Sequence, residues 1–361
     1  MNYRARKSRA ARAAKTAGVD GLLVTHLPDV RYLSGFTGSN AALVLVGGRS
    51  VLFTDGRYTA QAKEEAAGTK VVIAPKPAVT AACEWLAEAG VKRCGFDATQ
   101  TTVSSFEAMR KAVPAKVRRG MFVAVEPLVA ALRQVKDADE IERIRAAATL
   151  GCQLFDEALG YLRPGMTELE VAATLEHSAR KAGAEAMSFE TIVASGERSA
   201  LPHGRASLAK LPKRGFVTMD FGVVLDGYMS DMTRTVHLGK SSPEERDVYD
   251  AVLEAQEAAV LAVAPGVSAG EVDEAARSVL RRVELDKWFT HSTGHGVGLE
   301  IHEGPRLAAK QTQRLEPGMV ITIEPGVYMP GSFGLRIEDM VLVTAKGHEV
   351  LTPSVKAWIE L

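Results

Sequence analysis

The dipeptide Asp226-Gly227, which stands between two β-rich runs, constrains the fold of this chain more than any other local feature. A two-residue type I′ turn needs positive φ at both central positions, and Asp-Gly is one of the pairs that adopt it. Counting outward from this turn places Asp220 and Asp231 on one face of the hairpin as diagonal neighbours, ~7–8 Å apart at Cβ or somewhat less, with room between them at Gly222. The register therefore predicts that two carboxylates converge on one space.

Two ionised carboxylates that approach each other repel, and the repulsion raises a pKa unless a cation lies between them. Asp220 and Asp231 therefore either share a proton, as an acid/base dyad does, or bind a metal ion. A third interpretation, that both are solvent-facing strand residues, stays open on this hairpin alone.

A second hairpin carries acidic residues in apolar strands. Glu324 is the one acid of the run 320–324, and Arg336 and Glu338 share a face of the return strand because side chains alternate with a period of two. A charge in a core strand needs a partner. Arg336 could pair with one of the glutamates, which leaves the other unexplained, and an isolated solvated strand edge is the remaining alternative.

Three histidines and three glycines lie between the hairpins, within the thirteen residues 291–303. The glycines permit close approach of the backbone, and the imidazoles supply nitrogen ligands or proton carriers. The segment is not a His-Glu-x-x-His helix, because Arg306 stands where the second histidine would be, and it is not a dinucleotide-binding fingerprint. A further histidine, His203, follows a loop that contains Gly and Ser and has no meaning alone.

The composition is that of an ordinary globular protein without overall charge. Lys plus Arg and Asp plus Glu both number 44 among 361 residues, so no net field draws the chain to nucleic acid or to a membrane surface, and neither is expected as a partner. Three cysteines without Cys-x-x-Cys spacing indicate neither a disulfide framework nor a thiolate metal site, which favours a reducing, cytoplasmic location. No apolar run approaches the ~18–20 residues of a membrane-spanning helix.

Two domains are expected, at residues 1–130 and 131–361. In the first, short β-rich runs alternate with helical stretches, which is typical of an α/β domain. These runs are 22–24, 42–46, 51–53 and 71–73. Asp137 and Glu140 then form a capping box that begins a long helix. In the second domain, helices are predicted at 167–182, 243–263 and 269–283, and strands at 215–225, 228–237, 319–324 and 335–343. Helices grouped with hairpins predict an α+β domain.

Five residues of this second domain, taken in order, resemble the ligand set of the pita-bread metallopeptidases, the group of methionine aminopeptidase, aminopeptidase P and prolidase. They lie in the strings Asp-Phe-Gly-(x)4-Gly-Tyr-x-Ser-Asp-x-Thr-Arg-Thr, Gly-His-Gly-Val-Gly, Glu-Pro-Gly and Arg-Ile-Glu-Asp. The five residues are Asp220, Asp231, His295, Glu324 and Glu338. Five ligands in order, each in its own string, are far harder to meet by chance than one short motif.

The N-terminal part carries two further strings, at 31–39 and 54–58, that resemble the N-terminal domain of aminopeptidase P and related Xaa-Pro peptidases. Methionine aminopeptidases lack this domain, and creatinases have lost the metal ligands. The resemblance therefore implies a creatinase-like α/β N-terminal domain followed by an α+β pita-bread catalytic domain. Thr54-Asp-Gly-Arg-Tyr-x-x-Gln-Ala tilts the assignment slightly toward aminopeptidase P.

The resemblance implies metal-dependent hydrolysis of the peptide bond preceding proline, by a hydroxide that bridges two divalent metals. Release of the N-terminal residue from Xaa-Pro peptides is the favoured activity. A prolidase acting only on dipeptides and a non-catalytic pita-bread binding module are the alternatives. Mn²⁺ is the expected metal, with Co²⁺ or Zn²⁺ also suited to an oxygen-rich site. The partners are then peptides with proline at the second position, and the family suggests a homodimer.

The same resemblance implies how the metal ions are held. Asp220 would chelate one of them, and Asp231 and Glu338 would bridge both. His295 and Glu324 would complete the shell of the other. Glu324 would also serve as general base, taking the proton from the bridging water to the leaving proline nitrogen.

Four further side chains receive roles from the resemblance. His203, His291 and His302 would line the pocket, where they polarise the scissile carbonyl, stabilise the tetrahedral intermediate or position proline. Arg336 would hold a metal-binding carboxylate in orientation. A dedicated pocket is needed because the bond before proline is a tertiary amide with a ring-locked φ.

Overall fold

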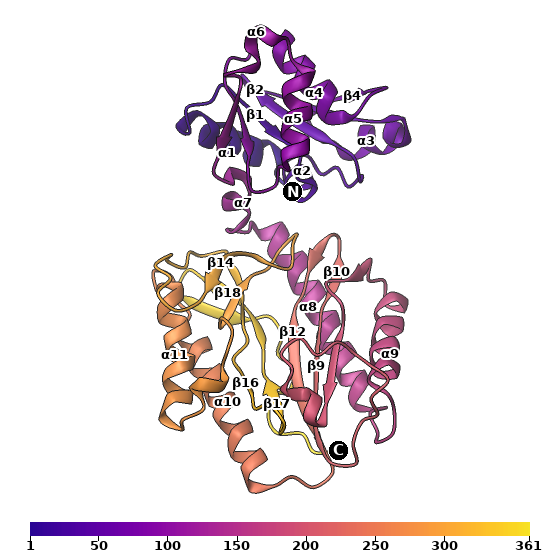
Figure 1. Cartoon of the computed structure of the whole chain (residues 1–361), viewed down its shortest axis with the longest axis vertical. Helices are drawn as coiled ribbons and strands as arrows, with labels where there is room; N and C mark the ends of the chain where they lie inside the picture. Colours follow the sequence, from indigo (N-terminus) through magenta and orange to yellow (C-terminus); the bar gives the residue numbers. More distant parts are fainter. The chain divides into compact units, whose positions relative to one another are not determined.

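The computed structural model describes residues 1–361 and divides into two compact units, Met1–Arg133 and Gln134–Leu361. Figure 1 shows both units as helices packed on strands. The boundary proposed near residue 130 falls within helix α7 (Leu128–Arg133), the last element of the N-terminal unit. Separate apolar cores form inside each unit, because the buried residues cluster without crossing this boundary.

The N-terminal unit is built on a six-stranded sheet in the order β4-β3-β2-β1-β5-β6. The strands are β1 (Gly21–Val24), β2 (Ala42–Val46), β3 (Arg49–Thr54), β4 (Lys70–Ile73), β5 (Cys94–Asp97) and β6 (Phe122–Val125). β1, β2 and β3 pair antiparallel, whereas β3–β4, β1–β5 and β5–β6 pair parallel. The four predicted strands are confirmed as β1 to β4. Sequence analysis missed β5 and β6.

Helices cover this sheet. They are α1 (Tyr3–Thr16), α2 (Leu27–Ser34), α3 (Thr59–Glu65), α4 (Ala78–Glu88), α5 (Val103–Ala112), α6 (Ala115–Arg118) and α7. Strands and helices alternate along the chain and the sheet is partly parallel, so the predicted α/β class is confirmed. The core includes Leu23, Val44, Phe53 and Leu86, all nearly inaccessible to solvent.

Four helices frame the C-terminal unit: α8 (Ala138–Leu159), α9 (Glu168–Lys181), α10 (Pro243–Ala262) and α11 (Ala269–Arg282). Each begins with a capping box, in which an Asp, Thr or Ser side chain and a Glu three residues later satisfy two free backbone N–H groups. The predicted helices and the Asp137–Glu140 capping box are confirmed. Figure 1 shows α8 and α9 on one flank of this unit and α10 and α11 on the other, with the strands between.

The strands of the C-terminal unit form four sheets, in the orders β12-β9-β8, β11-β10-β7, β14-β13-β15-β18-β19 and β16-β17. The strands of the first two are β7 (Ala186–Met187), β8 (Ile192–Ser195), β9 (Gly215–Phe221), β10 (Val223–Leu225), β11 (Tyr228–Met229) and β12 (Met232–Leu238). Those of the other two are β13 (Gly294–Gly296), β14 (Glu303–Leu307), β15 (Val320–Ile323), β16 (Gly326–Tyr328), β17 (Gly334–Arg336), β18 (Asp339–Thr344) and β19 (Gly347–Val350).

The predicted strands 215–225, 228–237 and 335–343 are correct in place but wrong in continuity. The first breaks at Gly222, the second between Met229 and Met232, and the third at 337–338. At Gly222 a β-carbon would overlap the carbonyl oxygen of Ser230, so the glycine is required by the close approach of two backbones. The second and third breaks contain the acidic residues Asp231 and Glu338.

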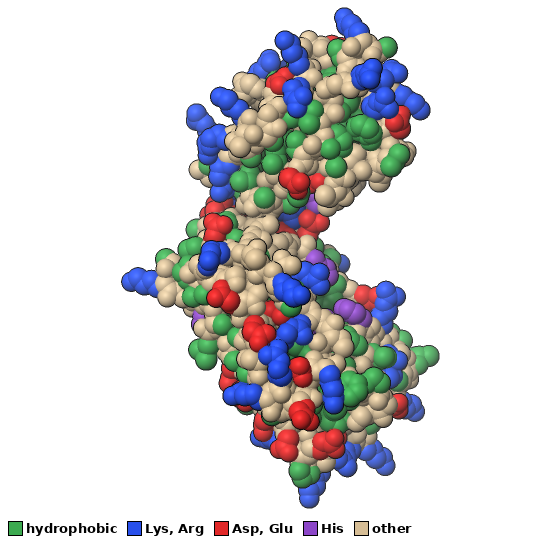
Figure 2. Space-filling view, turned by 60° about the vertical axis from the view of Figure 1, so that its left-hand side comes forward, with side chains coloured by type: hydrophobic (Ala, Val, Ile, Leu, Met, Phe, Trp, Pro, Cys, Tyr) green, Lys and Arg blue, Asp and Glu red, His purple; other side chains and the backbone are tan.

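The surface carries both signs of charge. Figure 2 shows Lys and Arg side chains beside Asp and Glu side chains on one face of the C-terminal unit, as the equal numbers of acids and bases lead one to expect. No helix is long and apolar enough to cross a membrane.

Candidate metal centre and substrate cavity

The first hairpin has the register that the Asp-Gly turn predicts. Leu225 pairs with Tyr228 across the turn, and Asp220 pairs with Thr233 between β9 and β12. Asp226 and Gly227 both have positive φ, at 47° and 73°. Asp220 and Asp231 converge as expected, and the alternative that both face solvent is wrong, because they are 8% and 5% exposed.

The second hairpin delivers two more carboxylates to the same place. Glu338 lies at the break between β17 and β18, and one oxygen of Glu338, Asp220 and Asp231 lies within 4.8 Å of the others. Glu324 follows the last residue of β15. The three carboxylates of the tight cluster come from two sheets, so their approach is a product of tertiary packing.

His295 joins the carboxylates from β13. Its Nε2 lies 3.4 Å from Glu324 Oε1 and 3.6 Å from Asp231 Oδ2. Its Nδ1 lies 3.1 Å from the carbonyl oxygen of Gly296, which accepts the ring proton and leaves Nε2 as the bare nitrogen that faces the carboxylates. Burial lowers the pKa of His295 to about 4, so the imidazole is neutral at physiological pH.

The carboxylates are buried, so solvent cannot stabilise their negative charges. Burial, and then the neighbouring carboxylates of Glu338 and Asp220, raise the pKa of Asp231 well above its usual range. Burial and the Glu324 and Asp220 carboxylates do the same for the pKa of Glu338, and burial raises the pKa of Glu324 to about 7. Such a cluster must take up either protons or cations.

Two observations show that cations fit. Asp220 Oδ1 and Glu338 Oε1 are buried without a hydrogen-bond partner, although buried polar atoms are nearly always paired. The donors are four carboxylates and one neutral imidazole, a hard set that suits divalent ions. The buried carboxylate cluster with its imidazole neighbour therefore fits divalent metal ions.

Arg336 lies beneath this cluster and supports it. Its Nη2 donates to Asp220 Oδ2 at 2.5 Å, and its Nε donates to Thr233 Oγ1, which in turn donates to Glu338 Oε2 at 2.7 Å. The interpretation that Arg336 pairs directly with a glutamate is wrong, because the ion pair is with Asp220. Its five donors in a rigid fork allow one side chain to orient two carboxylates.

Tyr328 of β16 was not found by sequence reasoning. Its hydroxyl accepts a hydrogen bond from Arg336 Nη1 at 2.6 Å and lies 3.0 Å from His291 Nε2. His291 Nδ1 lies 2.9 Å from the carbonyl oxygen of Ser292, so Nε2 is the acceptor for the Tyr328 proton. Burial raises the pKa of Tyr328 to about 12, which keeps this proton in place. No sequence signal marks the tyrosine, since a lone aromatic in a short strand is usually core.

A cavity of about 670 Å³ opens above the cluster. All five predicted metal ligands, the three predicted pocket histidines and Arg336 line it. The His302 ring lies 4.4 Å from the His295 ring, centre to centre. Burial, and then the Arg336 charge, lower the pKa of His291 to about 4, and burial with His203 nearby lowers the pKa of His302. Both imidazoles are neutral at physiological pH.

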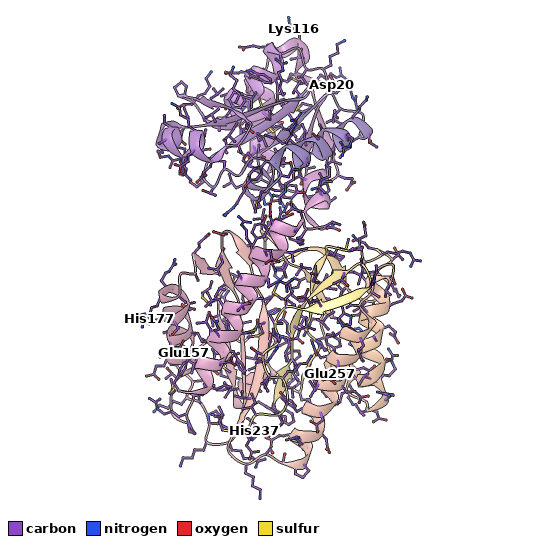
Figure 3. The ribbon with its side chains drawn as sticks, turned by 180° about the vertical axis from the view of Figure 1, so that it is seen from behind. Asp20, Lys116, Glu157, His177, His237 and Glu257 are labelled. Atoms are coloured by element: carbon purple, nitrogen blue, oxygen red, sulfur yellow. The ribbon has the colours of Figure 1, made fainter.

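Two other histidines of the C-terminal unit, His177 and His237, lie outside the cavity. Figure 3 labels His177, on α9, and His237, at the end of β12. The His237 ring is buried and stacks on Trp358 at 5.4 Å, and its Nδ1 lies 2.8 Å from the carbonyl oxygen of Gly239. Neither His177 nor His237 lines the cavity.

The sequence and the structure match known proteins over most or all of the chain. Residues 142–345 match the model of metallopeptidase family M24, and residues 6–135 match the creatinase/prolidase N-terminal domain. The Xaa-Pro dipeptidase of Pyrococcus horikoshii is 35% identical over 92% of this chain and 93% of its own.

Two solved structures show the same architecture. The Xaa-Pro dipeptidase from Bacillus anthracis superimposes with a TM-score of 0.96 at 39% identity and covers 100% of both chains. The X-Pro aminopeptidase from Thermotoga maritima superimposes with a TM-score of 0.89 at 35% identity and covers 97% of this chain and 100% of its own. The expected creatinase-like domain followed by a pita-bread domain is confirmed. The match to the family model and the relatives that align over nearly all of the chain show that it is a metallopeptidase of family M24, and the carboxylate cluster agrees with this.

Proposed function

We propose that this metallopeptidase hydrolyses the peptide bond preceding proline and releases the N-terminal residue from Xaa-Pro peptides. The observation that carries the proposal is the joint position of the five candidate ligands and three histidines around one cavity. The printed activities of the relatives, Xaa-Pro dipeptidase and X-Pro aminopeptidase, support the same substrate class.

The candidate ligands would hold two divalent cations, whose positive charge would balance the four carboxylates. We favour Mn²⁺ for this oxygen-rich set, with Co²⁺ or Zn²⁺ as alternatives. Bound there, the ions would supply Lewis-acid activation of water and of the scissile carbonyl. Asp220 would hold one ion and Asp231 and Glu338 would be shared by both, and the three residues offer oxygens within 4.8 Å of one another.

Glu324 is the candidate general base. Its Oε1 lies 3.4 Å from His295 Nε2 at the wall of the cavity, where the carboxylate could accept a proton from water and return it to the leaving proline nitrogen. Its Oε1 also accepts a hydrogen bond from Thr322 Oγ1 at 3.2 Å, which fixes its orientation.

The histidines are candidates for substrate contact. His302 is neutral, so it can donate its one ring proton to a carbonyl oxygen without bringing a charge that repels the cations. His291 is also neutral, but its ring proton faces the Ser292 carbonyl and its Nε2 accepts from Tyr328, so it would contact substrate through the face or edge of its ring. His203 lines the same cavity from a different loop. These three side chains would polarise the scissile carbonyl and position the proline.

A dipeptide-only activity is the second candidate, and Arg306 favours it. Arg306 lines the cavity from β14, opposite His295, and its guanidinium makes no ion pair, whereas Arg205 at the same cavity pairs with Glu190 at 2.9 Å. A free guanidinium binds the carboxylate of a peptide C-terminus well. In Xaa-Pro that carboxylate belongs to the proline itself.

The test compares Xaa-Pro, Xaa-Pro-Yaa and Xaa-Ala peptides as substrates of the purified protein with Mn²⁺, Co²⁺ or Zn²⁺. Release of the N-terminal residue from Xaa-Pro peptides alone supports the proposal, and the ratio of the first two substrates decides between aminopeptidase and dipeptidase. Absence of hydrolysis with every metal would instead favour a non-catalytic binding module. Full activity after exhaustive chelation would contradict the role of the metal.

We further propose a cytoplasmic location and a homodimer. All three cysteines are free, and Cys83 and Cys94 are buried, which supports a reducing compartment. The homodimer rests on the family resemblance and is tested by light scattering of the purified protein.

A further inference from the structure

We propose that Glu168 is a positioning residue, which clamps the loop from Ser195 to Ser207 and thereby sets the place of His203 in the substrate cavity. The inference rests on the proposed function, because His203 acts on substrate only if the cavity binds Xaa-Pro peptides. Glu168 itself does not line the cavity.

Glu168 stands at the start of α9 and is fully buried. Its Oε1 accepts hydrogen bonds from the Ser195 backbone N at 2.9 Å and from Ser195 Oγ at 3.0 Å. Its Oε2 accepts from the Ser207 backbone N at 3.1 Å, from Ser207 Oγ at 2.7 Å and from Arg198 Nε at 3.0 Å. One carboxylate therefore binds the two ends of the loop and one point within it.

The clamped loop forms part of the cavity wall, because Pro202, His203 and Arg205 all line the cavity. The imidazole of His203 makes no hydrogen bond to the rest of the protein, so its place is set by the backbone that carries it. The loop also reaches the metal cluster, since the Pro202 carbonyl oxygen accepts from Arg336 Nη1 at 3.0 Å. A shift of the loop would move His203 relative to the cations and the substrate.

Helix capping does not account for this carboxylate. Thr167 and Glu170 already form the capping box of α9, with Thr167 Oγ1 accepting from the Glu170 backbone N. An ionised carboxylate is the one side chain here that accepts at both oxygens, because a glutamine would present its NH₂ group to donors. The Glu168 carboxylate therefore accepts hydrogen bonds from the loop and does not cap the helix.

The experiment measures hydrolysis of Xaa-Pro by Glu168→Gln, with Glu170→Gln as the matched control. Both variants lose one carboxylate from the first turn of α9, and only Glu168 contacts the loop. We expect kcat/KM to fall on the order of 10–100-fold in Glu168→Gln, since small misplacements of catalytic groups have such costs. We expect Glu170→Gln to stay close to the wild type, and metal content to be unchanged in both.

A double-mutant cycle with His203→Ala separates positioning from general stability. If Glu168 acts through His203, Glu168→Gln should cost less than about threefold in the His203→Ala background. Hydrogen exchange gives a readout independent of turnover. Backbone amides of residues 196–206 should exchange faster in Glu168→Gln than in Glu170→Gln.

Two results would overturn the inference: an equal loss of activity in both His203 backgrounds, or full activity with unchanged exchange in folded Glu168→Gln. If the wild type fails to cleave Xaa-Pro peptides, the proposed function fails, and the exchange experiment still decides whether Glu168 clamps the loop. If Glu168→Gln does not fold, Ser207→Ala removes one donor to the same carboxylate and enters the same cycle.

Discussion

Arg336 Nη2 donates to Asp220 Oδ2 at 2.5 Å, and this contact joins the two hairpins that carry the candidate metal ligands. Both partners are buried. The same guanidinium reaches Tyr328 and the Pro202 carbonyl oxygen, so one side chain links the metal cluster to two walls of the cavity. Without the Arg336 guanidinium, a bound metal ion would be the only cation in contact with Asp220.

Arg336→Lys is expected to reduce kcat and metal affinity by about 10–100-fold, the usual cost of losing an outer partner of a metal ligand. Lysine keeps the charge but cannot make the forked contacts to Asp220, Thr233 and Tyr328. Metal titration followed by calorimetry and steady-state kinetics would check this. Unchanged metal affinity would show that Asp220 is oriented without the fork.

Asp231→Asn should abolish turnover and at the same time raise the Tm of the metal-free protein. The substitution keeps the shape and removes a carboxyl group whose ionised form is destabilised by burial and by the Glu338 and Asp220 carboxylates. Relief of repulsion shifts Tm by about 2–4 °C per kcal/mol in a domain of this size. Thermal unfolding with and without Mn²⁺ measures both effects, and Mn²⁺ should no longer raise the Tm.

Cys152→Ala is the control for that experiment. Cys152 is a free, partly buried residue of α8 that does not line the cavity. Turnover and the Tm increase on adding Mn²⁺ should both be retained. Wild-type activity in Asp231→Asn, or in Glu324→Ala, would count heavily against the proposed mechanism.

In the metal-free protein, Glu324 should contribute stability that is lost as pH rises from about 4.5 to about 7, opposite in sign to the contributions of His291 and His295, whose pKa values are lowered to about 4. Burial raises the pKa of Glu324 from 4.5 to about 7, so the folded state binds more protons than the unfolded state in this range. The stability contribution is therefore present below pH 4.5 and lost as pH rises through about 7. Urea unfolding of metal-free wild type and Glu324→Gln across this range measures it. The stability of the variant should fall less, or rise more, with pH than that of the wild type, and an identical slope would contradict the assignment.

Gly222→Ala should destabilise the first hairpin by about 1–3 kcal/mol and weaken metal binding. The added methyl would overlap the Ser230 carbonyl oxygen, which is backbone and can move only with the strand that carries Asp231. Gly120→Ala is a suitable control, because no atom lies within 4 Å of the methyl it would add and the residue does not have a positive φ. Urea unfolding and metal titration compare the two variants.

Arg306→Ala should lower kcat/KM for Xaa-Pro more than for Xaa-Pro-Yaa. Loss of a charged hydrogen bond costs about 1.5–3 kcal/mol, or roughly 10–100-fold. Parallel assays of the two peptides measure the ratio. An equal loss for both substrates would mean that Arg306 does not bind the proline carboxylate, and would favour the aminopeptidase.

The convergence of Asp220 and Asp231 could be predicted because local chemistry fixed the register of the first hairpin, whereas the other candidate ligands came from the family resemblance. A type I′ turn at Asp226-Gly227 leaves one pairing, and the two-residue period then decides which side chains share a face. The observed pairing of Asp220 with Thr233 follows from that count. The helix starts were predictable for a similar reason, since a capping box is a contact between residues three apart.

The strand breaks could not be predicted, because they depend on contacts between distant segments. The sequence around Gly222 reads as a continuous strand, and the need for glycine arises only from the approach of Ser230. Glu338 likewise lies in an apolar run whose break becomes visible only in the folded chain. Tyr328 and Glu168 were missed because each has a partner far along the sequence, His291 for Tyr328 and Ser195 for Glu168.

The amino-acid sequence by itself determined the helix caps, the first hairpin and the identity of the acidic and imidazole side chains, because these depend on dihedral preferences and spacings of a few residues. Tertiary structure alone decided that two sheets bring Asp220, Asp231 and Glu338 within 4.8 Å, and that Arg336 joins Asp220 and not a glutamate. The physical reason is that buried like charges approach only when the packing of whole sheets compensates their repulsion, and no local segment contains that energy.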